Sequence, residues 1–497
     1  MYDYLLFPTE FNRGSVMYMK LCFLLLCSVF ITPVFSQENK AVDFDKKFHQ
    51  DSVKLWTRNL LDVMQTGHPG FYWYTPKERF DVIIDSTLQT VTDSLNTLDF
   101  YRKVKPLIAQ IGCLHTGIVL PEAYEKAMEE TKTFIPLEIF IDENRKVFIT
   151  KNHSENESIP IKGELLFING KPIASIINTL VKAIPSDGYN VTEKILALNL
   201  RFPFWYQSMI EMTDTFTVKI ASENTVQEYK IKGITPEVFP SYEKFASIHK
   251  EQLSFEIKDD VGVLKIQTFA KSLIKKNGQN FKGFIKDVFK TLEERETENL
   301  IIDLRYNTGG TDSNAALLAS YFFEEEFRYW DRIEVTESIA NQVSKGSAKI
   351  FYSKPEKKDS TYLWKGALLT KEFKYYKPQK PAKHNFKGNT YLLTNGFCMS
   401  SAADFIAILS DNEKAKVIGE ESAGGYQGNT SGLMPEVTMG GVFVITVPLN
   451  KYINAVDPTK NIGRGTIPDY PVTISLEDWM SKKDVVKAAA FDIIKLN

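Results

Sequence analysis

The chain is poor in cysteine and has no excess of charge of either sign. Its 497 residues include four cysteines, and 60 Lys and Arg residues balance 62 Asp and Glu residues, for a formal net charge of −2 at pH 7. Such a chain lacks the basic footprint with which proteins bind nucleic acid or anionic lipid, so we expect neither as a partner. The six histidines and four cysteines show no metal-ligand spacing, and we expect no metal and no cofactor. With 43% hydrophobic and 25% charged residues, the composition is otherwise that of a globular protein.

The sequence also lacks an apolar run long enough to cross a membrane. The run Leu21–Phe35 has about 15 residues and falls short of the ~20 that a membrane-spanning helix needs. It follows a basic residue and ends in small or branched residues before Ser36, as in a secretory signal cleaved after Ser36. We therefore predict a signal peptide at residues 1–36 and export to the periplasm, the cell envelope or the medium. Its removal leaves Cys113 and Cys398, too few for a disulfide framework.

The hydrophobic pattern divides the rest of the chain into regions of different secondary structure. Apolar residues first recur at helical spacing, then form short strands, and from about residue 253 strands and helices alternate. Alternation of this kind predicts an α/β domain. We predict a helical region at 37–130, a β module at 131–235, an α/β domain at 250–480 and a C-terminal helix at 481–497.

One segment of the β module has a recognisable pattern. Residues 163–172 read Gly-Glu-Leu-Leu-Phe-Ile-Asn-Gly-Lys-Pro, which predicts a strand, a tight Asn-Gly turn and the start of a helix over Ile173–Ile184. The segment resembles the middle of a PDZ domain. PDZ domains capture a peptide as an added strand, and the resemblance implies such binding near Phe134–Leu137. The alternative is a small β module that only positions the other domains.

Two strand–turn–helix junctions in the α/β region have the residue types that catalysis needs. At the first, the strand Asn299–Leu304 leads into a turn that ends in Gly309 and Gly310, and such a glycine turn can present backbone N–H groups to an anion. No Gly-Lys-Ser/Thr follows, so the turn is not a phosphate-binding P-loop. At the second, a strand ends near Thr394 and Ser401 opens a helix of small residues. The serine is either a helix cap or a nucleophile beside N–H groups that stabilise an oxyanion.

Both junctions, in this order, resemble those of the C-terminal processing peptidases, or tail-specific proteases, and of the tricorn-core group of serine peptidases. The resemblance is carried by four ordered blocks, Asp303–Gly310, Ser400–Asp404, Val417–Glu420 and Gly465–Asp469. It implies an α/β catalytic domain of the crotonase-like ββα spiral type, preceded by the N-terminal helical region and the PDZ-like β module.

The resemblance also implies roles for residues in these blocks. Ser401 is the implied nucleophile, and the N–H groups of Ala402 and of Gly309 or Gly310 form the implied oxyanion hole. The register of the block is uncertain by one residue, so Ser400 is the rival nucleophile.

The residue that activates the serine departs from the pattern of many tail-specific proteases. They place a lysine shortly after the Gly-Glu block, but residues 419–429 contain none, which argues against a Ser–Lys dyad. The tricorn-like branch uses a histidine supplied from before the PDZ-like module, and His115 in Ile111–Gly117 looks like that block. An imidazole titrates near neutral pH, as a general base should. We therefore predict His115 as the base.

A base needs an orienting partner, and here the sequence leaves alternatives open. The tricorn pattern places a glutamate before the Pro-Asp block, but residues 461–464 read Asn-Ile-Gly-Arg. Several polar residues near the proposed site remain as candidates, and we include the first of them in the predicted site: Glu420, Glu421, Asp404, Thr116 and Ser422.

The sequence thus predicts an exported serine endopeptidase that hydrolyses polypeptides through an acyl-enzyme. Two alternatives remain. One is a non-catalytic protein that binds peptides or hydrophobic ligands on the same fold, and the other is an esterase. The retained Ser401 and His115 favour an enzyme, whereas the missing lysine and glutamate favour the binding protein.

Overall fold

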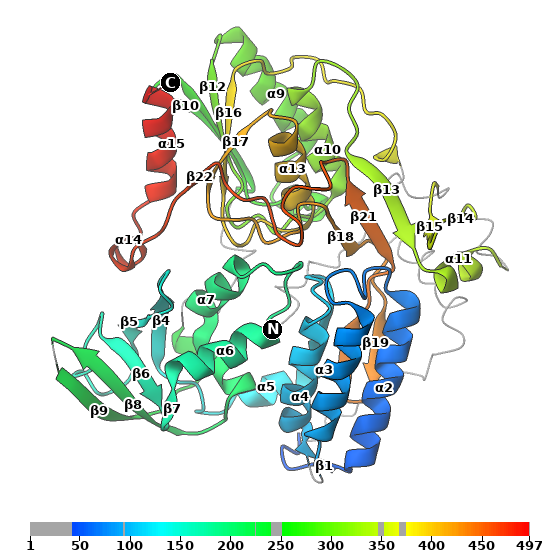
Figure 1. The fold of residues 1–497 in the computed structure, drawn as a ribbon. Helices are drawn as coiled ribbons and strands as arrows, with labels where there is room; N and C mark the ends of the chain where they lie inside the picture. Colours follow the sequence, from blue (N-terminus) through cyan, green and yellow to red (C-terminus); the bar gives the residue numbers. More distant parts are fainter. Residues whose placement is uncertain are drawn as a thin grey trace.

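Three regions of regular structure follow one another along the chain (Figure 1). The computed structural model describes residues 42–92, 95–223, 225–239, 251–345, 352–366 and 374–496. The predicted signal peptide lies outside these residues. In Figure 1 the N-terminal helices lie at lower right, the β module at lower left and the α/β region at the top. No helix in the described parts of the chain is both long and apolar enough to cross a membrane.

The first region is mainly helical, as the sequence predicts, with three very short strands. Two of its helices begin at side chains that accept a backbone N–H: His49 accepts from Asp51, and Asn96 accepts from Asp99 at 2.8 Å. Its elements are β1 (Lys47–Phe48), α2 (Gln50–Gly67), α3 (Lys77–Gln89), β2 (Leu95–Asn96), α4 (Thr97–Ala109), β3 (Gly117–Val119) and α5 (Glu122–Glu129).

The β module is an antiparallel sheet covered by two helices. Its order is β4-β5-β6-β8-β9, with β7 paired to β6. The predicted Asn-Gly turn is confirmed: Asn169 and Gly170 both have positive φ, 47° and 74°, and Ile168 pairs with Lys171. The elements are β4 (Leu137–Ile141), β5 (Val147–Asn152), β6 (Glu164–Ile168), β7 (Lys171–Pro172), α6 (Ile173–Ala183), α7 (Thr192–Met209), β8 (Thr215–Ser222), β9 (Thr225–Lys232) and the short helix η2 (Pro236–Val238).

The α/β region is built on a six-stranded sheet of order β10-β11-β12-β16-β17-β22. All neighbouring strands from β11 onward are parallel, and β10 is an antiparallel edge strand. The strands are β10 (Leu253–Lys258), β11 (Val261–Ile266), β12 (Asn299–Asp303), β16 (Asn389–Thr394), β17 (Lys416–Gly419) and β22 (Tyr470–Pro471). The helices are α8 (Lys271–Lys276), α9 (Phe281–Glu294), α10 (Asp312–Ala319), η3 (Ser320–Phe322), α13 (Ser400–Asp411), α14 (Leu476–Ser481) and α15 (Val485–Leu496). The predicted mixed α/β architecture is confirmed.

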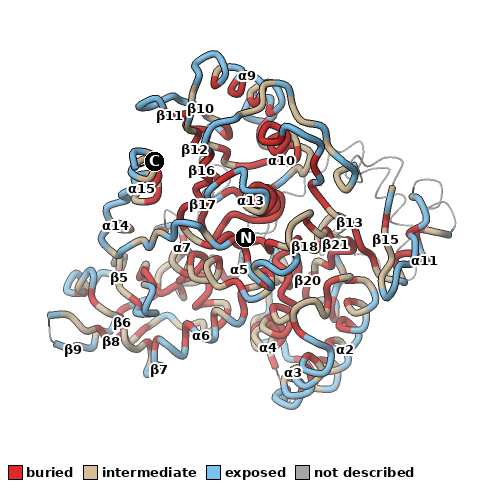
Figure 2. The backbone as a smooth tube through the Cα atoms, turned by 45° about the horizontal axis from the view of Figure 1, so that its top comes forward, coloured by how far each residue is buried: buried red, intermediate tan, exposed pale blue. Residues whose placement is uncertain are grey.

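Helices cover both faces of this sheet, which explains why its central strands are apolar on both sides. On one face, Ile301 and Leu393 pack against Val486 and Ala490 of α15. On the other, Ile302 and Leu392 join the main core. Figure 2 shows β12, β16, β17 and α13 as buried chain at the centre of the molecule.

Two smaller sheets connect the α/β region to the N-terminal region. One has the order β14-β15-β13-β21-β18, and the other has the order β19-β20-β3. In the second, Val444 pairs with Val119 and Thr446 with Gly117, so a late segment of the chain holds the strand that starts directly after His115. The elements are β13 (Trp330–Val335), α11 (Glu337–Val343), β14 (Glu356–Lys358), β15 (Thr361–Leu363), β18 (Gly428–Ser431), β19 (Glu436–Met439), β20 (Phe443–Thr446) and β21 (Asn450–Asn454).

Candidate active site

The serine turn between β16 and α13 holds Ser400 in a strained conformation. Helix α13 begins at Ser400, and its N-cap residue is Met399, with no side-chain capping bond. Neither Ser400 nor Ser401 is therefore a helix cap. Ser400 has φ of 49°, a left-handed conformation that is uncommon for a serine and concentrates at functional sites.

The glycine turn after β12 packs directly against the serine turn. Asn307 organises both, because its carbonyl accepts from Met399 N–H at 3.1 Å and its Oδ1 accepts from Gly309 N–H at 2.9 Å. Gly309 has φ of 96°, and a Cβ there would lie 2.7 Å from Ser400 Cβ. Of the two glycines considered as N–H donors, Gly309 has its N–H engaged by Asn307. Gly310, with φ of 137°, is the remaining candidate.

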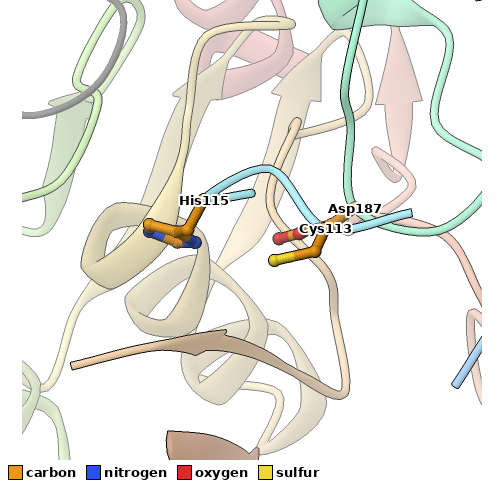
Figure 3. Close-up of side chains that lie close together, drawn as sticks. All are labelled: Cys113, His115 and Asp187. Carbon is orange, nitrogen blue, oxygen red and sulfur yellow. The ribbon is translucent and has the colours of Figure 1, made fainter. Parts of the chain in front are cut away.

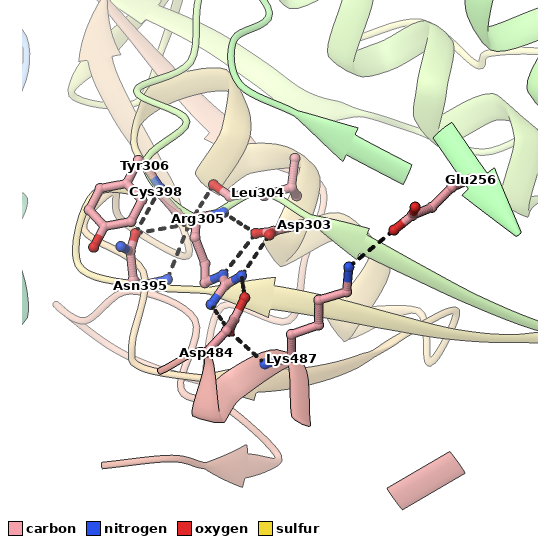
Figure 4. A network of polar contacts seen from close by, with 9 residues as sticks. All are labelled: Glu256, Asp303, Leu304, Arg305, Tyr306, Asn395, Cys398, Asp484 and Lys487. Carbon is pink, nitrogen blue, oxygen red and sulfur yellow. Dashed lines mark hydrogen bonds and ion pairs between the residues drawn. The ribbon is translucent and has the colours of Figure 1, made fainter. Parts of the chain in front are cut away.

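A partly buried ion-pair network holds this glycine turn to the residue that precedes the C-terminal helix (Figure 4). Arg305 donates to Asp303 through Nε at 2.9 Å and Nη2 at 2.7 Å, and to Asp484 through Nη1 at 2.6 Å. The Asp303 side chain is only 6% exposed. The thiol of Cys398 donates to Leu304 carbonyl at 3.1 Å. The network has a structural role. Asp303 and Arg305 hold the glycine turn, and Cys398 joins the serine turn to it.

His115 comes from the N-terminal region and meets the serine turn. It lies in the loop between α4 and β3, and its Nε2 is 3.3 Å from Ser400 Oγ. His115 is 1% exposed and Ser400 is 9% exposed. Burial lowers the pKa of His115 to about 3, so the ring is neutral at pH 7 and can accept a proton at Nε2 in the appropriate tautomer.

The structure separates the two candidate serines. Ser400 is the one against His115, whereas Ser401 is fully buried and its Oγ has no hydrogen-bond partner among the described residues. The Ser401 carbonyl accepts from Tyr329 hydroxyl at 3.4 Å. If Ser400 is the nucleophile, the following N–H is that of Ser401 instead of Ala402, whose N–H donates to Met399 carbonyl at 3.0 Å.

Asp187 is the acidic residue that lies beside His115 (Figure 3). It follows α6, and its carboxylate accepts from Leu114 N–H at 2.8 Å and from Gly425 N–H at 3.1 Å. It thereby joins the histidine loop to the loop that packs on Ser400, because a Cβ on Gly424 would lie 3.1 Å from Ser400 N. Burial raises the pKa of Asp187 to about 6.

The five residues considered as orienting partners have other contacts. Glu420 belongs to the loop after β17, where its N–H donates to Thr394 carbonyl and its carbonyl accepts from Thr394 hydroxyl. The others are engaged as follows: Glu421 with Arg464 and Gly465 N–H, Ser422 with Thr466 N–H, Asp404 with the side-chain amides of Asn429 and Asn454, and Thr116 with His68 Nε2.

Asp187 and His68 are absent from the prediction made from the sequence. Asp187 stands in the turn Pro185-Ser186-Asp187-Gly188, which reads as an ordinary loop. His68 is buried, its Nδ1 accepts from Gly70 N–H at 3.1 Å and its Nε2 is 2.9 Å from Thr116 Oγ1. The only signal in the sequence is that a His-Pro-Gly break follows the first helix.

Comparisons with known proteins show a family match and a shared fold. Residues 260–472 match the family model described as peptidase family S41. The structure of mature CPAF complexed with lactacystin is similar at 14% identity and a TM-score of 0.61, over 90% of this chain and 99% of that chain. A second structure of mature CPAF has 14% identity and a TM-score of 0.59, over 89% and 96%. At this identity the likeness shows a shared fold.

The fold and the matched domain define a serine-type peptidase, a hydrolase. The matched residues 260–472 contain the four sequence blocks that resemble those of the C-terminal processing peptidases.

Proposed function

We propose that the protein cleaves polypeptides through an acyl-enzyme formed on Ser400, with His115 as the general base. One observation carries the proposal: His115 Nε2 lies 3.3 Å from Ser400 Oγ although the two residues are 285 positions apart. A nucleophile and a base within hydrogen-bond reach are the signature of covalent catalysis, and such contacts are often looser without substrate.

The proposed steps conserve protons. Ser400 Oγ attacks the peptide carbonyl while its proton moves to His115 Nε2, and the resulting oxyanion is held by the N–H groups of Ser401 and Gly310. The protonated imidazole then gives its proton to the leaving amine. Water, deprotonated by His115, attacks the acyl carbonyl, and the imidazolium returns this proton to Ser400 Oγ as the ester bond breaks and the new carboxyl end leaves.

The test compares the two serines directly. The mature protein and its Ser400→Ala, Ser401→Ala and His115→Ala variants are assayed on an unfolded protein substrate, with thermal unfolding as the folding control. We expect Ser400→Ala and His115→Ala to lose roughly 10⁴-fold or more in kcat/KM. Ser401→Ala removes only a buried hydroxyl and should keep most of the activity. An inactive Ser401→Ala beside an active Ser400→Ala would assign the nucleophile to Ser401, as the sequence register predicts.

Asp187 has the role of a positioning residue in this mechanism. Its two oxygens fix Leu114, next to the base, and Gly425, next to the loop on the nucleophile. Asp187→Asn keeps the size but faces one of these N–H donors with an NH₂ group. Because a misplacement of about 1 Å can cost ~10²-fold, kcat should fall on that order with KM little changed. A raised KM with an unchanged kcat would contradict the role.

The finer architecture and the location belong to the same proposal. The order β6, Asn-Gly turn, β7 and α6 supports a PDZ-like module, and the strand–turn–helix junctions support a crotonase-like spiral. The apolar run before Ser36 supports export. Sequencing the N-terminus of the protein recovered from the cell envelope or medium tests export, and a chain beginning after Ser36 is the expected product.

A further inference from the structure

A thiol, an imidazole and a carboxylate meet beside the proposed nucleophile (Figure 3). One ligand atom from each of Cys113, His115 and Asp187 lies within 4.8 Å of the other two. All three residues are buried, with exposures of 4%, 1% and 2%. Cys113 and His115 flank Leu114 in one loop, and the N–H of Leu114 fixes Asp187 against that loop at 2.8 Å. The mechanism uses the imidazole and the clamp on Asp187, but it has no use for the thiol.

We infer that Cys113, His115 and Asp187 form an inhibitory site for a borderline-soft divalent cation such as Zn²⁺. The inference rests on the proposed role of His115 as the base. A cysteine sulfur, a histidine nitrogen and a carboxylate oxygen are the ligands that Zn²⁺ takes, and three protein ligands leave its fourth position for water. Mg²⁺ and Ca²⁺ prefer oxygen ligands, so the site discriminates against them.

Binding of a cation requires the loop that carries Cys113 and His115 to change the contacts of the Cys113 thiol. In a tetrahedral Zn²⁺ site, bonds of about 2.0–2.3 Å bring the ligand atoms within 4.8 Å of one another, a separation that these three atoms already meet. The Cys113 thiol now makes a long contact, 3.5 Å to Thr430 carbonyl, and further hydrogen bonds with Thr116 and with the backbone at His115, and coordination replaces the contact to Thr430. The thiol gives up its proton to solvent when it binds the cation.

Coordination inactivates the base whichever ring nitrogen it uses. If Nε2 binds the cation, its lone pair is no longer available to the Ser400 proton. If Nδ1 binds, the neutral ring carries its own proton on Nε2, which then donates and cannot accept. The cation therefore blocks the transfer from Ser400 without touching the serine.

Cobalt binding and zinc inhibition test the inference separately. The reduced, metal-stripped full protein is titrated with CoCl₂ and followed by absorbance, and peptidase activity is measured against ZnCl₂ with and without a chelator. We expect one Co²⁺ per chain with a sulfur-to-cobalt charge-transfer band, and inhibition by Zn²⁺ that the chelator reverses. MgCl₂ should not inhibit.

The two cysteines provide a matched pair of variants. Cys113→Ser should lose the charge-transfer band and weaken Zn²⁺ inhibition by more than the 10–100-fold typical of losing an outer-shell partner. Cys398→Ser removes the other buried thiol and should keep both effects, measured against its own activity without metal. An unchanged band or unchanged inhibition in Cys113→Ser would overturn the site.

Two other results are distinguishable. Absence of the band in an active protein overturns the metal site and leaves the peptidase mechanism standing. A Cys113-dependent band with no effect of Zn²⁺ on activity overturns the inhibitory role, whereas the role of His115 as the base is tested by His115→Ala.

Discussion

A methyl group at Gly309 should inactivate the enzyme by displacing Ser400, the proposed nucleophile. The Cβ of Gly309→Ala would lie 2.7 Å from Ser400 Cβ, 2.9 Å from Met399 carbonyl oxygen and 3.1 Å from Ser401 N. Two of these atoms belong to the backbone and the third is fixed to it, so the serine turn has to move as a unit. Oxyanion donors and nucleophile would then shift together relative to His115.

The effect of Gly309→Ala has two parts, a loss of stability and a loss of kcat, that can be measured separately. Gly309 has φ of 96°, and a left-handed conformation costs an L-residue about 1–2 kcal/mol in stability. The steric shift adds to this loss and also acts on catalysis. Removal of one oxyanion donor costs about 10²–10³-fold in kcat, and a misplacement of about 1 Å costs ~10²-fold. We therefore expect kcat to fall by at least ~10²-fold.

Gly278→Ala is the matched control. Gly278 has φ of 74°, but its Cβ would meet no atom within 4 Å, so it carries the backbone penalty without the contact. Urea unfolding measures stability and turnover of an unfolded protein measures kcat for both variants. If Gly309→Ala kept wild-type kcat, or lost no more stability than Gly278→Ala, the packing of the two turns would not matter as argued.

Three further predictions concern stability and the thiols. Arg305→Gln should cost about 3–5 kcal/mol in urea unfolding because it leaves Asp303 as an unpaired buried charge, and a loss below 1 kcal/mol would contradict this. Burial raises the pKa of Asp404 from 3.8 to about 7, so the folded protein binds this proton more tightly than the unfolded chain. Wild type should therefore gain about 2–3 kcal/mol from this group between pH 8 and pH 5, and Asp404→Asn should lack that gain; equal pH dependence would refute it. Cys113 and Cys398 are free, and burial raises the pKa of each thiol to about 12, so a thiol reagent at neutral pH should label neither until the protein unfolds, and a reductant should not change activity.

Local patterns in the sequence were enough to predict many helices and strands of the fold. The strand predicted over Asn299–Leu304 is β12, and the helix predicted over Ile173–Ile184 is α6, each within one residue. Their signals are short-range, because an apolar run or an apolar stripe is read within one element. Helix α7 was not predicted, since Pro203 lies inside it and the chain kinks at Arg201. The short strands β18 to β21 were also missed; β21 and β20 pair with the distant strands β13 and β3, although β19 and β20 also form a local hairpin.

The candidate site was predictable only in part for the same reason. The two junctions are local patterns, and the sequence brought Ser400, Ser401 and His115 into consideration. Whether Ser400 or Ser401 faces the imidazole depends on the left-handed φ of Ser400. This φ could not be predicted from the residue types in the segment. Asp187 was missed because its importance comes from two backbone N–H groups of loops that are 73 and 238 residues away in sequence.

The pairing of β3 with β20 has a consequence for the order of events during synthesis. The strand that follows His115 is made early, but its partner, Phe443–Thr446, leaves the ribosome more than 300 residues later. Chains grow at about 5–20 residues per second, so the nascent chain spends many seconds without the sheet that positions its base. Under the proposed mechanism, a newly made chain is thus unable to cut itself or its neighbours until nearly all of it has emerged.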